Sequence, residues 1–331
     1  MNTREPTKSV AVVLFQFGGP DSLDAIEPFL VNLFSDPDII DFPLANIARP
    51  TLARLIARNR AQKVRQHYAA IGGKSPILEL TLRQGRALQD TLRIVPGLMP
   101  SGFVGMRYSN PTIEGVVATI ACKSFDSVVL LPLFPQYSHT TTRSSLSEWD
   151  RQLTKINLDG LPVFTIPQFY DHSGYIEALV EKINEGLKHF PADAQIHMIF
   201  SAHGVPLTAI KAGDPYCRQI KETTRLVLKR GGWNYPHSLC YQSKAGPGRW
   251  TKPMLDKTLA EVQGQGYSHL LIVPVSFVTD HVETLYEINL EARQQAKEMG
   301  VEQFEVMPAL NDSPRFIEAL RDLVLESINS Y

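Results

Sequence analysis

The sequence predicts an α/β fold made of two similar lobes, each with a parallel sheet, and a central cleft between them. Short apolar runs rich in β-branched residues alternate with longer amphipathic stretches, which is typical of parallel sheets covered by helices. The segments after these runs also recur. In each half, one run leads into a Gly-Pro turn, and another run contains a proline and leads into a segment that carries a histidine.

Four apolar runs are predicted as strands. They are VAVVLF (10–15), SVVLLPLF (127–134), IHMIFS (196–201) and HLLIVPV (269–275). None alternates clearly between apolar and polar residues, as expected of strands that helices cover on both faces.

Three stretches are predicted as helices, at 26–34, 175–187 and 313–328. The first places Ile26, Phe29, Leu30, Leu33 and Phe34 on one face. In the last, Ser313 is the predicted N-cap and Pro314 the first helical residue. Its inward residues are Phe316, Ile317, Leu320, Leu323 and Val324.

The domain organisation follows from this order of elements. We expect an N-terminal lobe over 1–165 and a C-terminal lobe over 166–310. The helix within 311–331 is expected to pack back on the N-terminal lobe.

Composition narrows the class of protein. A net charge of −1 gives no reason to expect a nucleic-acid partner. The three cysteines are far apart and form no CxxC pair, so neither an iron–sulfur cluster nor a structural zinc site is expected. No GxGxxG or P-loop motif points to a nucleotide. The N-terminus lacks the apolar stretch of a signal peptide, so a cytoplasmic location is expected.

Two histidines follow the predicted strands of the second half. His203 lies in the turn SAHGVP (201–206), and His281 lies in VTDHVET with Glu283 close behind. Ligands bind beyond the carboxyl ends of parallel strands, so we expect these side chains to face one crevice. Imidazole and carboxylate suit divalent metals such as Fe²⁺ and proton transfer near pH 7. The alternative is a structural role for each histidine.

An acidic series continues from this point. On an α-helix, Glu283, Glu287 and Glu291 would fall at i, i+4 and i+8 and form one ridge. Like charges at that spacing destabilise a helix slightly, so the ridge favours a relay for hydrated cations. An exposed helix face is the alternative.

The first half carries groups of the opposite charge. Residues 42–78 contain no Asp or Glu but seven Arg and Lys, among them Arg54 and Arg58. Such a segment can hold an anionic ligand, rest on an anionic membrane, or form a solvated helical hairpin. Further on, Arg107, Tyr108 and Tyr137 could bind carboxylates and stack on a flat ring.

With these residues in place, the chain resembles the ferrochelatases from about residue 9 to the C-terminus. The matching segments are LFQFGGPDS, IGGKSPI, GMRYSNP, PLFPQYSHTTTRSSL, FSAHGVP, GDPY, YQSKAGP followed by Trp250, and FVTDHVETLYEI. Their order and spacing make the resemblance specific.

The resemblance implies two Rossmann-like lobes of the chelatase fold and insertion of Fe²⁺ into a porphyrin. It implies no organic cofactor, since Fe²⁺ is a substrate. It also assigns roles. The catalytic pair is His203 and Glu283, and His281 and Glu287 join them on the metal side. The porphyrin-binding residues are Phe17, Arg107, Tyr108, Tyr137, Ser138 and Trp250.

The expected partners are therefore a porphyrin and ferrous iron, with the chain a monomer. The basic segment 42–78 would be a porphyrin-facing lip, or would touch the inner face of an anionic membrane. The porphyrin can be protoporphyrin IX or coproporphyrin III. Arg249 precedes Trp250 where many members of the family have proline, which leaves the shape of that loop open. The rival functions are a haem carrier and a cobalt or nickel chelatase.

Overall fold

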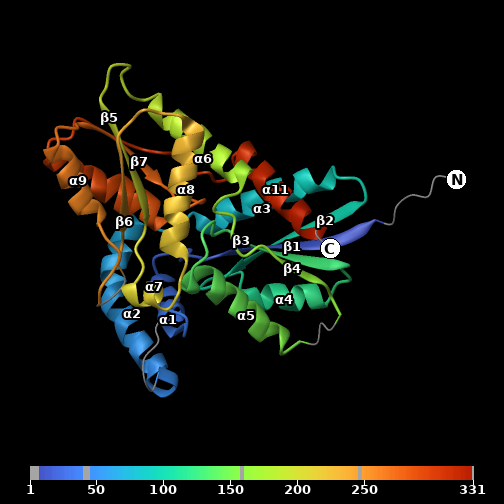
Figure 1. Cartoon of the computed structure of the whole chain (residues 1–331). Helices are drawn as coiled ribbons and strands as arrows, with labels where there is room; N and C mark the ends of the chain where they lie inside the picture. Colours follow the sequence, from blue (N-terminus) through green and yellow to red (C-terminus); the bar gives the residue numbers. More distant parts are fainter. Residues whose placement is uncertain (1–6, 40–44, 157–159, 245–247, 330–331) are drawn as a thin grey trace. The chain divides into compact units, whose positions relative to one another are not determined.

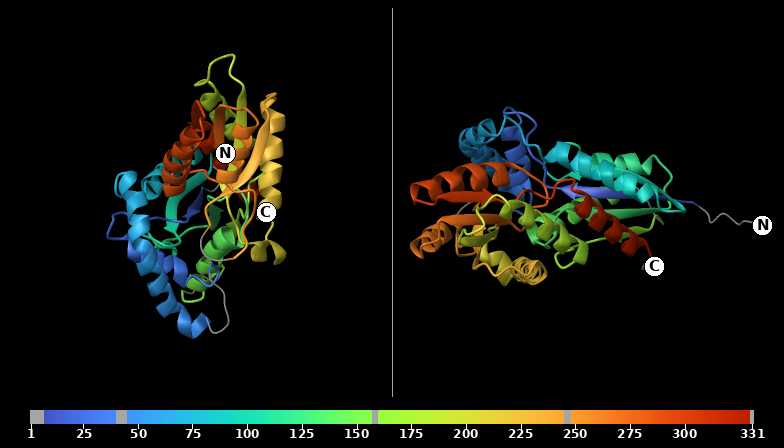
Figure 2. Two further views of the ribbon diagram at one scale, coloured as in Figure 1. Left: turned by 90° about the vertical axis from the view of Figure 1, so that its left-hand side faces the viewer. Right: turned by 90° about the horizontal axis from the view of Figure 1, so that it is seen from above.

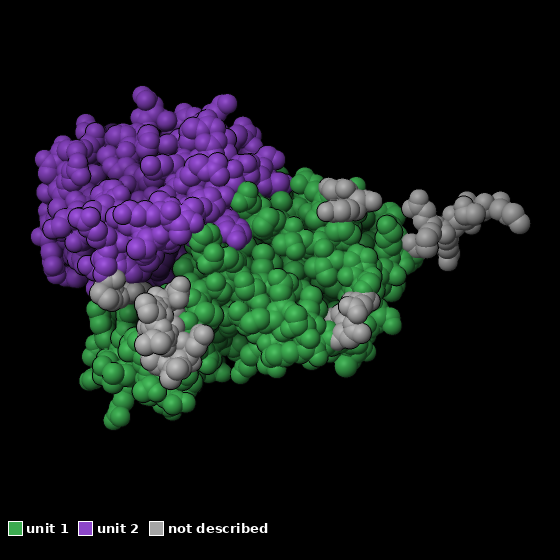
Figure 3. All heavy atoms as spheres, turned by 60° about the horizontal axis from the view of Figure 1, so that its bottom comes forward, with its two compact units in different colours: residues 1–134, 138–169, 312–331 green, residues 135–137, 170–311 purple. Residues whose placement is uncertain are grey.

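The computed structural model describes residues 7–39, 45–156, 160–244 and 248–329. The chain divides into two compact units, which Figure 3 distinguishes by colour. Unit 1 contains residues 1–134, 138–169 and 312–331, and unit 2 contains residues 135–137 and 170–311. The short insertion at 135–137 and a boundary after Phe169 are details that the sequence-based division did not contain.

Unit 1 has a four-stranded parallel sheet in the order β2-β1-β3-β4 (Figure 1). The strands are β1 (Lys8–Gln16), β2 (Leu98–Met106), β3 (Ser127–Pro132) and β4 (Val163–Thr165). Its helices are α1 (Ile26–Ser35), α2 (Ala45–Ala70), α3 (Ile77–Arg93), α4 (Ile113–Ala121), α5 (Ser144–Leu153) and α11 (Pro314–Asn329), with the π-helix η1 (His139–Arg143) before α5.

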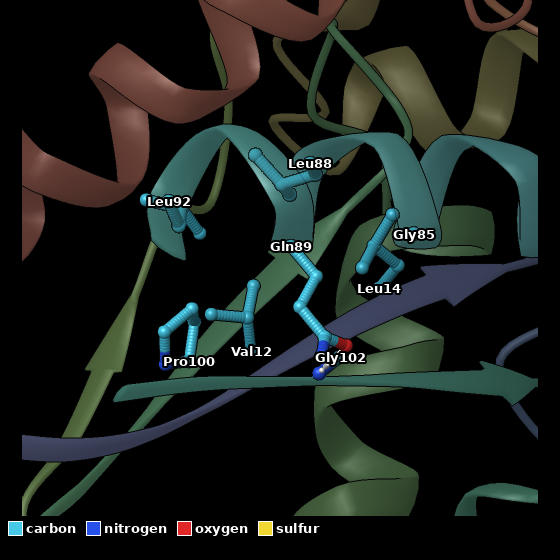
Figure 4. Close-up of a pocket in the computed structure, with 8 residues that line it drawn as sticks. All are labelled: Val12, Leu14, Gly85, Leu88, Gln89, Leu92, Pro100 and Gly102. Carbon is cyan, nitrogen blue, oxygen red and sulfur yellow. Dashed lines mark hydrogen bonds between the residues drawn. The ribbon is translucent and has the colours of Figure 1, made fainter. Parts of the chain in front are cut away.

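Alternate residues of β1 face opposite layers of helices. Ala11, Val13 and Phe15 pack with side chains of α4 and with Trp149 of α5. Val12 and Leu14 face α3 instead (Figure 4). Both sets are buried, which explains why the run 10–15 shows no polar alternation.

Gly102 lets α3 approach β2 closely (Figure 4). A Cβ atom on Gly102 would lie 3.3 Å from the carbonyl oxygen of Gly85 and 3.2 Å from Oε1 of Gln89. That Oε1 accepts a hydrogen bond from the Gly102 N–H at 3.0 Å. The gap between the two elements is too small to hold a water molecule, so it is part of the core and not a ligand site.

Unit 2 repeats the architecture with a parallel sheet in the order β6-β5-β7-β8. The strands are β5 (Ile196–His203), β6 (His237–Gln242), β7 (His269–Pro274) and β8 (Gln303–Val306). The helices are α6 (Ser173–Leu187), α7 (Leu207–Lys211), α8 (Tyr216–Gly231), α9 (Leu255–Gly264), the π-helix η2 (Glu283–Ala292) and α10 (Arg293–Glu298). The α/β class with two parallel sheets is thus confirmed.

Helices cover the second sheet on both faces. Leu270 and Ile272 of β7 pack with residues of α9, η2 and α10. On β7's other face, a Cβ on Gly186 of α6 would meet Leu271 at 3.0 Å, so α6 lies close against the strand. The neighbouring helix α8 contacts α6 (Figures 1 and 2).

The predicted helices agree with the structure except in two details. All five inward residues of 313–328 are buried on α11, which contacts α3 within unit 1. On α1, Leu33 is only half-buried, whereas the other four predicted residues are buried. Ser313 occupies the predicted N-cap position before Pro314, and its carbonyl accepts from the Ile317 N–H. Its buried hydroxyl has no hydrogen-bond partner among the described residues, so the side chain itself does not cap the helix.

The basic segment forms one long helix, α2, and not a hairpin. Its residues 42–44 lie outside the described part of the chain. Ala57 and Tyr68 are buried, Arg54 and Arg58 are exposed, and Leu55 is 57% exposed. Across the described ranges, no helix combines the length and apolar character needed to span a bilayer.

Candidate active site

His203 and Glu283 form a direct pair within unit 2. His203 is the last residue of β5, and Glu283 is the first residue of η2. Nδ1 of His203 lies 2.8 Å from Oε2 of Glu283. A carboxylate accepts hydrogen bonds, so this contact places the imidazole proton on Nδ1. The lone pair of the neutral ring is then on Nε2, where it can take up a proton or bind a metal.

The turn after His203 is held against the end of β6. The Gly204 N–H donates to the Gln242 carbonyl at 2.7 Å. A Cβ on Gly204 would lie 2.7 Å from the backbone oxygen of Ser243, so only glycine fits. The His203 N–H donates to Ser276 Oγ at 3.2 Å, which anchors the same residue to the segment after β7. The histidine is thus fixed from two neighbouring strand ends.

The pair controls the ionisation of both partners. Burial alone would raise the pKa of Glu283, but attraction to His203 and the hydrogen bond from it lower that pKa to about 2. Burial alone would lower the pKa of His203, but attraction to Glu283 and the same hydrogen bond raise it. The pair therefore favours an ionised carboxylate and a more basic imidazole.

His281 lies on the other side of Glu283. Its Nε2 is 3.9 Å from Oε1 of Glu283. Its Nδ1 lies 3.1 Å from the Thr279 carbonyl, which places a proton on Nδ1. The ring of Phe277 packs at 4.6 Å between centroids. As predicted from their positions after strands of the second half, both histidines lie beside Glu283.

The acidic series lies on a π-helix, whereas an α-helix was predicted. η2 spans Glu283–Ala292, and its i→i+5 bonds widen the turn. Residues four apart still lie within one turn of each other. Glu283 and Glu287 are half-buried and Glu291 is exposed. The series therefore runs from solvent at Glu291 to Glu283, which contacts His203. Burial, with repulsion by Glu283, raises the pKa of Glu287 to about 7.

Ser243 was not among the predicted site residues. It follows β6 with a φ of 57°, a left-handed conformation that is uncommon for a residue other than glycine. Its hydroxyl donates to Oε2 of Glu287 and lies 3.4 Å from Oε2 of Glu283. Its signal in the sequence was the family-like segment YQSKAGP alone, because the edge strand β6 that precedes it was not predicted.

These side chains do not form a closed metal cage. Among the residues that the structure describes, no group of three or more His, Cys, Asp or Glu side chains is placed to hold a metal ion. The assignment of His203, His281, Glu283 and Glu287 as metal-side residues therefore stays a prediction.

Trp250 lies beside the His203 turn in unit 2. It forms an isolated antiparallel bridge with Pro206, and the Thr251 N–H donates to the Val205 carbonyl at 3.1 Å. The Trp250 indole N–H is buried and forms no hydrogen bond in the described structure. The Leu207 N–H donates to the Arg249 carbonyl at 2.8 Å, which ties Arg249 to the start of α7.

Tyr137 and Ser138 have separate surroundings. Tyr137 belongs to unit 2, where its N–H donates to Oε1 of Gln219 at 2.7 Å. Ser138 belongs to unit 1, is buried, and caps η1 by accepting from the Thr140 N–H. The structure thus gives the Ser138 hydroxyl a capping role, and its predicted contact with substrate is not favoured by this geometry.

Phe17 and Tyr108 pack together in unit 1, where two strand-end loops meet. Their ring centroids are 4.7 Å apart with an interplanar angle of 71°, an edge-to-face contact. The Tyr108 N–H donates to the Phe17 carbonyl at 3.1 Å. Gly18 has a φ of 91°, and a Cβ there would lie 2.4 Å from Ser109 Oγ. The segments FGGP and RYSNP, which are far apart in the sequence, therefore pack directly against each other.

Arg107 is held by acidic side chains of the same unit. Its guanidinium lies 2.9 Å from Asp36 and 3.7 Å from Glu148, and its Nε–H donates to Ser144 Oγ. Only 12% of its side chain is exposed. A direct contact between Arg107 and a substrate carboxylate stays a prediction that this geometry does not favour.

Solved structures define the class of protein. The chain aligns with SirB from Bacillus subtilis, solved with Fe³⁺, over 98% of its length and 97% of that chain, with a TM-score of 0.57. It aligns with CbiX, the terminal enzyme for sirohaem biosynthesis in denitrifying bacteria, over 97% and 99%, with a TM-score of 0.51. Both are 13% identical in sequence. The fold is therefore that of the chelatases.

Sequence comparison defines the family. A ferrochelatase family model matches residues 9–328. Curated ferrochelatases are 46% identical in Geobacter metallireducens, 44% in Geotalea daltonii and 42% in Aquifex aeolicus. These alignments cover 96% of this chain and 98%, 98% and 99% of the relatives. The chain belongs to the ferrochelatase family, whose members are lyases that insert metal into porphyrin, and the sequence-based recognition is confirmed.

Proposed function

We propose that this chain inserts Fe²⁺ into a porphyrin of the protoporphyrin IX or coproporphyrin III type. Membership of the ferrochelatase family supports the reaction class. The main support for the mechanism is the 2.8 Å contact between Nδ1 of His203 and Oε2 of Glu283. A carrier protein would have no need of an oriented base beside an ionised carboxylate.

The reaction exchanges two pyrrole N–H protons for one Fe²⁺ ion, with no change in oxidation state. We assign His203 as the base, because Glu283 orients its ring and leaves the lone pair on Nε2. Each imidazolium formed in this way is stabilised by the adjacent carboxylate. Release of the proton to solvent then restores the base for the second pyrrole.

Glu287 and His281 are proposed to act on the metal side. A hydrated Fe²⁺ ion exchanges water for carboxylate and imidazole ligands readily. Glu287 has a pKa of about 7, so near neutral pH it can exchange a proton for a cation. Glu291 is exposed and follows Glu287 by four residues on η2, so it would be the outer end of this path.

The macrocycle-side residues are proposed to be Phe17, Tyr108, Tyr137 and Trp250. Phe17 and Tyr108 support this role because their rings form a rigid edge-to-face pair in which Phe17 is partly exposed. Binding against such a wall can bend the ring toward the metalated shape, a strain of roughly 1–5 kcal/mol. No organic cofactor is needed for any step.

We further propose that the protein acts as a cytoplasmic monomer that can touch the inner face of an anionic membrane. The exposed Arg54, Leu55 and Arg58 of α2 support the membrane contact, because basic and apolar groups together favour an anionic interface. No nucleic-acid partner is proposed.

Anaerobic incubation with Fe²⁺ and each of the two porphyrins, followed by Soret and Q-band absorbance, tests the proposal. Enzymatic metalation of one porphyrin is expected, and the preferred porphyrin identifies the substrate. Porphyrin binding without metalation would instead identify a carrier. Turnover with Co²⁺ or Ni²⁺ and a different tetrapyrrole, but none with Fe²⁺, would identify another chelatase.

A further inference from the structure

Asp36 is a completely buried carboxylate in unit 1. None of its side chain is exposed. Its Oδ2 accepts hydrogen bonds from the Tyr108 hydroxyl and from Ser144 Oγ, both at 2.5 Å, and lies 2.9 Å from a guanidinium nitrogen of Arg107. Its Oδ1 accepts from the Asp38 N–H at 2.9 Å. A buried carboxylate is tolerated only when it is satisfied in this way.

The partners of Asp36 come from three separate parts of the unit. Asp36 itself follows α1, Arg107 and Tyr108 follow β2, and Ser144 begins α5. One carboxylate therefore joins three strand-end and helix-end segments. The neighbouring acid, Asp38, forms a 3.4 Å ion pair with Arg143, whose side chain is 44% exposed.

The same contacts extend to the Phe17 ring through Tyr108. The Arg107 guanidinium lies 5.0 Å from the centroid of the Tyr108 ring, and the centroid of the Phe17 ring lies 4.7 Å from the same point in an edge-to-face contact. Tyr108 is 2% exposed, whereas Phe17 is partly exposed. Asp36 thus binds Tyr108, which packs against Phe17, and Arg107, which lies against the Tyr108 ring, while its own side chain is fully buried.

We propose that Asp36 is a positioning residue for macrocycle binding, which fixes Tyr108 and Arg107 so that Phe17 is presented in one orientation. This inference rests on the proposed function, in which Phe17 contacts the porphyrin. It gives Arg107 an internal role and explains why this basic side chain is turned toward Asp36 and Glu148.

Asp36→Asn tests the inference, because it keeps the size of the side chain and removes its charge. Two effects are expected, a lower melting temperature and a porphyrin KM raised roughly tenfold, since small displacements of binding groups can cost far more than that. The KM for Fe²⁺ should stay within about twofold, because the metal-side residues lie in the other unit. Asp38→Asn is the matched control and should leave both KM values unchanged.

Tyr108→Phe provides the second variant in case Asp36→Asn does not fold. It removes only the hydroxyl that Asp36 accepts from, and should raise the porphyrin KM less than Asp36→Asn does. The double variant should show a non-additive effect on porphyrin KM, because one contact is removed twice. A porphyrin KM within about twofold of wild type in Tyr108→Phe and in any folded Asp36→Asn would overturn the inference, as would an equal rise in both substrates' KM values.

Porphyrin binding without iron separates this inference from the proposed function. Quenching of porphyrin fluorescence gives a Kd for wild type and variants that does not depend on turnover. A wild type that binds porphyrin but inserts no iron would reject the proposed function, while the ratio of the Asp36→Asn and wild-type Kd values still decides the role of Asp36. A wild type that binds no porphyrin would overturn both.

Discussion

Nδ1 of His203 and Oε2 of Glu283 are 2.8 Å apart although the two residues are 80 positions apart in the chain. One ends a central strand of the second sheet and the other begins the π-helix after the neighbouring strand. Parallel strands place their carboxyl ends at one edge of the sheet, which is why the fold can assemble such a pair. The pair is the basis of the first prediction.

His203→Ala should lower the rate of iron insertion by a factor of about 10²–10⁴ while porphyrin binding remains measurable, because it removes the base and not the macrocycle wall. Steady-state kinetics and porphyrin fluorescence measure the two effects. A variant that keeps a tenth or more of wild-type turnover would show that His203 is not the base.

Glu283→Gln adds a pH test of the same pair. Attraction to Glu283 raises the pKa of His203, so activity should rise with pH as the imidazole loses its proton above its usual range. Removing the carboxylate charge should shift this rising limb to lower pH and lower the maximal kcat. An unshifted limb in the pH profile of kcat would assign the titration to another group.

Gly204→Ala should destabilise the protein by roughly 1–3 kcal/mol, because the new Cβ would lie 2.7 Å from one backbone oxygen and 3.1 Å from another. Thermal unfolding measures this loss. Gly264→Ala is the matched control, since a Cβ there meets nothing within 4 Å at the end of α9. Equal melting temperatures for the two variants would mean that the His203 turn can relax away from β6.

The central strands were predictable from the sequence and the edge strands were not. The four predicted runs are β1, β3, β5 and β7, the inner pair of each sheet. Buried on both faces, they consist of continuous apolar residues. The edge strands lack that signal. Met99 of β2 is 56% exposed, and β4 has only three residues.

Site residues that follow central strands could be predicted from the sequence. Site residues whose positions depend on contacts between segments far apart in the sequence were harder to predict. His203, His281 and Glu283 follow central strands, so the parallel topology alone brings them together. Glutamates four residues apart, as in η2, fit one face of an α-helix about as well as of a π-helix, so the sequence could not distinguish the two. Nothing near Arg107 in the chain shows that Asp36 will bury and pair with it.

Ser243 offers a test that separates its hydroxyl from its backbone. Ser243→Ala and Ser243→Gly both remove the hydrogen bond to Glu287, so both should raise the KM for Fe²⁺ by roughly tenfold. Only glycine relieves the left-handed φ of 57°, so the Gly variant should be more stable than the Ala variant by about 1 kcal/mol. If the two variants differ in Fe²⁺ KM as they do in stability, the backbone and not the hydroxyl is responsible.

The exposed basic face of α2 gives a membrane prediction. Arg54→Glu with Arg58→Glu should weaken binding to vesicles that contain anionic phosphatidylserine. The expected loss of binding free energy is about 1 kcal/mol for each basic residue removed. Vesicle co-sedimentation, with neutral phosphatidylcholine as reference, measures the effect. Arg86→Glu with Lys257→Glu makes the same change in net charge on other exposed sites. Equal weakening by the two pairs would point to net charge alone.

If Glu287 passes cations toward Glu283 and His281, its charge should matter for iron and not for porphyrin. Glu287→Gln keeps shape and hydrogen bonding but removes the charge. The relay predicts a raised KM for Fe²⁺ with the porphyrin KM nearly unchanged. It also predicts that the Fe²⁺ KM of wild type falls as pH rises through about 7, the pKa of Glu287, and that this dependence is lost in the variant.

Stability provides a readout of Glu287 that needs no turnover. Its pKa is raised from 4.5 to about 7, so between these values the folded state binds a proton that the unfolded state does not. Stability contributed by this group therefore falls as pH rises through that window. Glu287→Gln should raise the melting temperature at pH 8 but not at pH 4, whereas Glu291→Gln, at an exposed position, should change it at neither. If Glu287→Gln raises the melting temperature at pH 8 but leaves the KM for Fe²⁺ unchanged, Glu287 is a buried carboxyl group with no part in metal transfer.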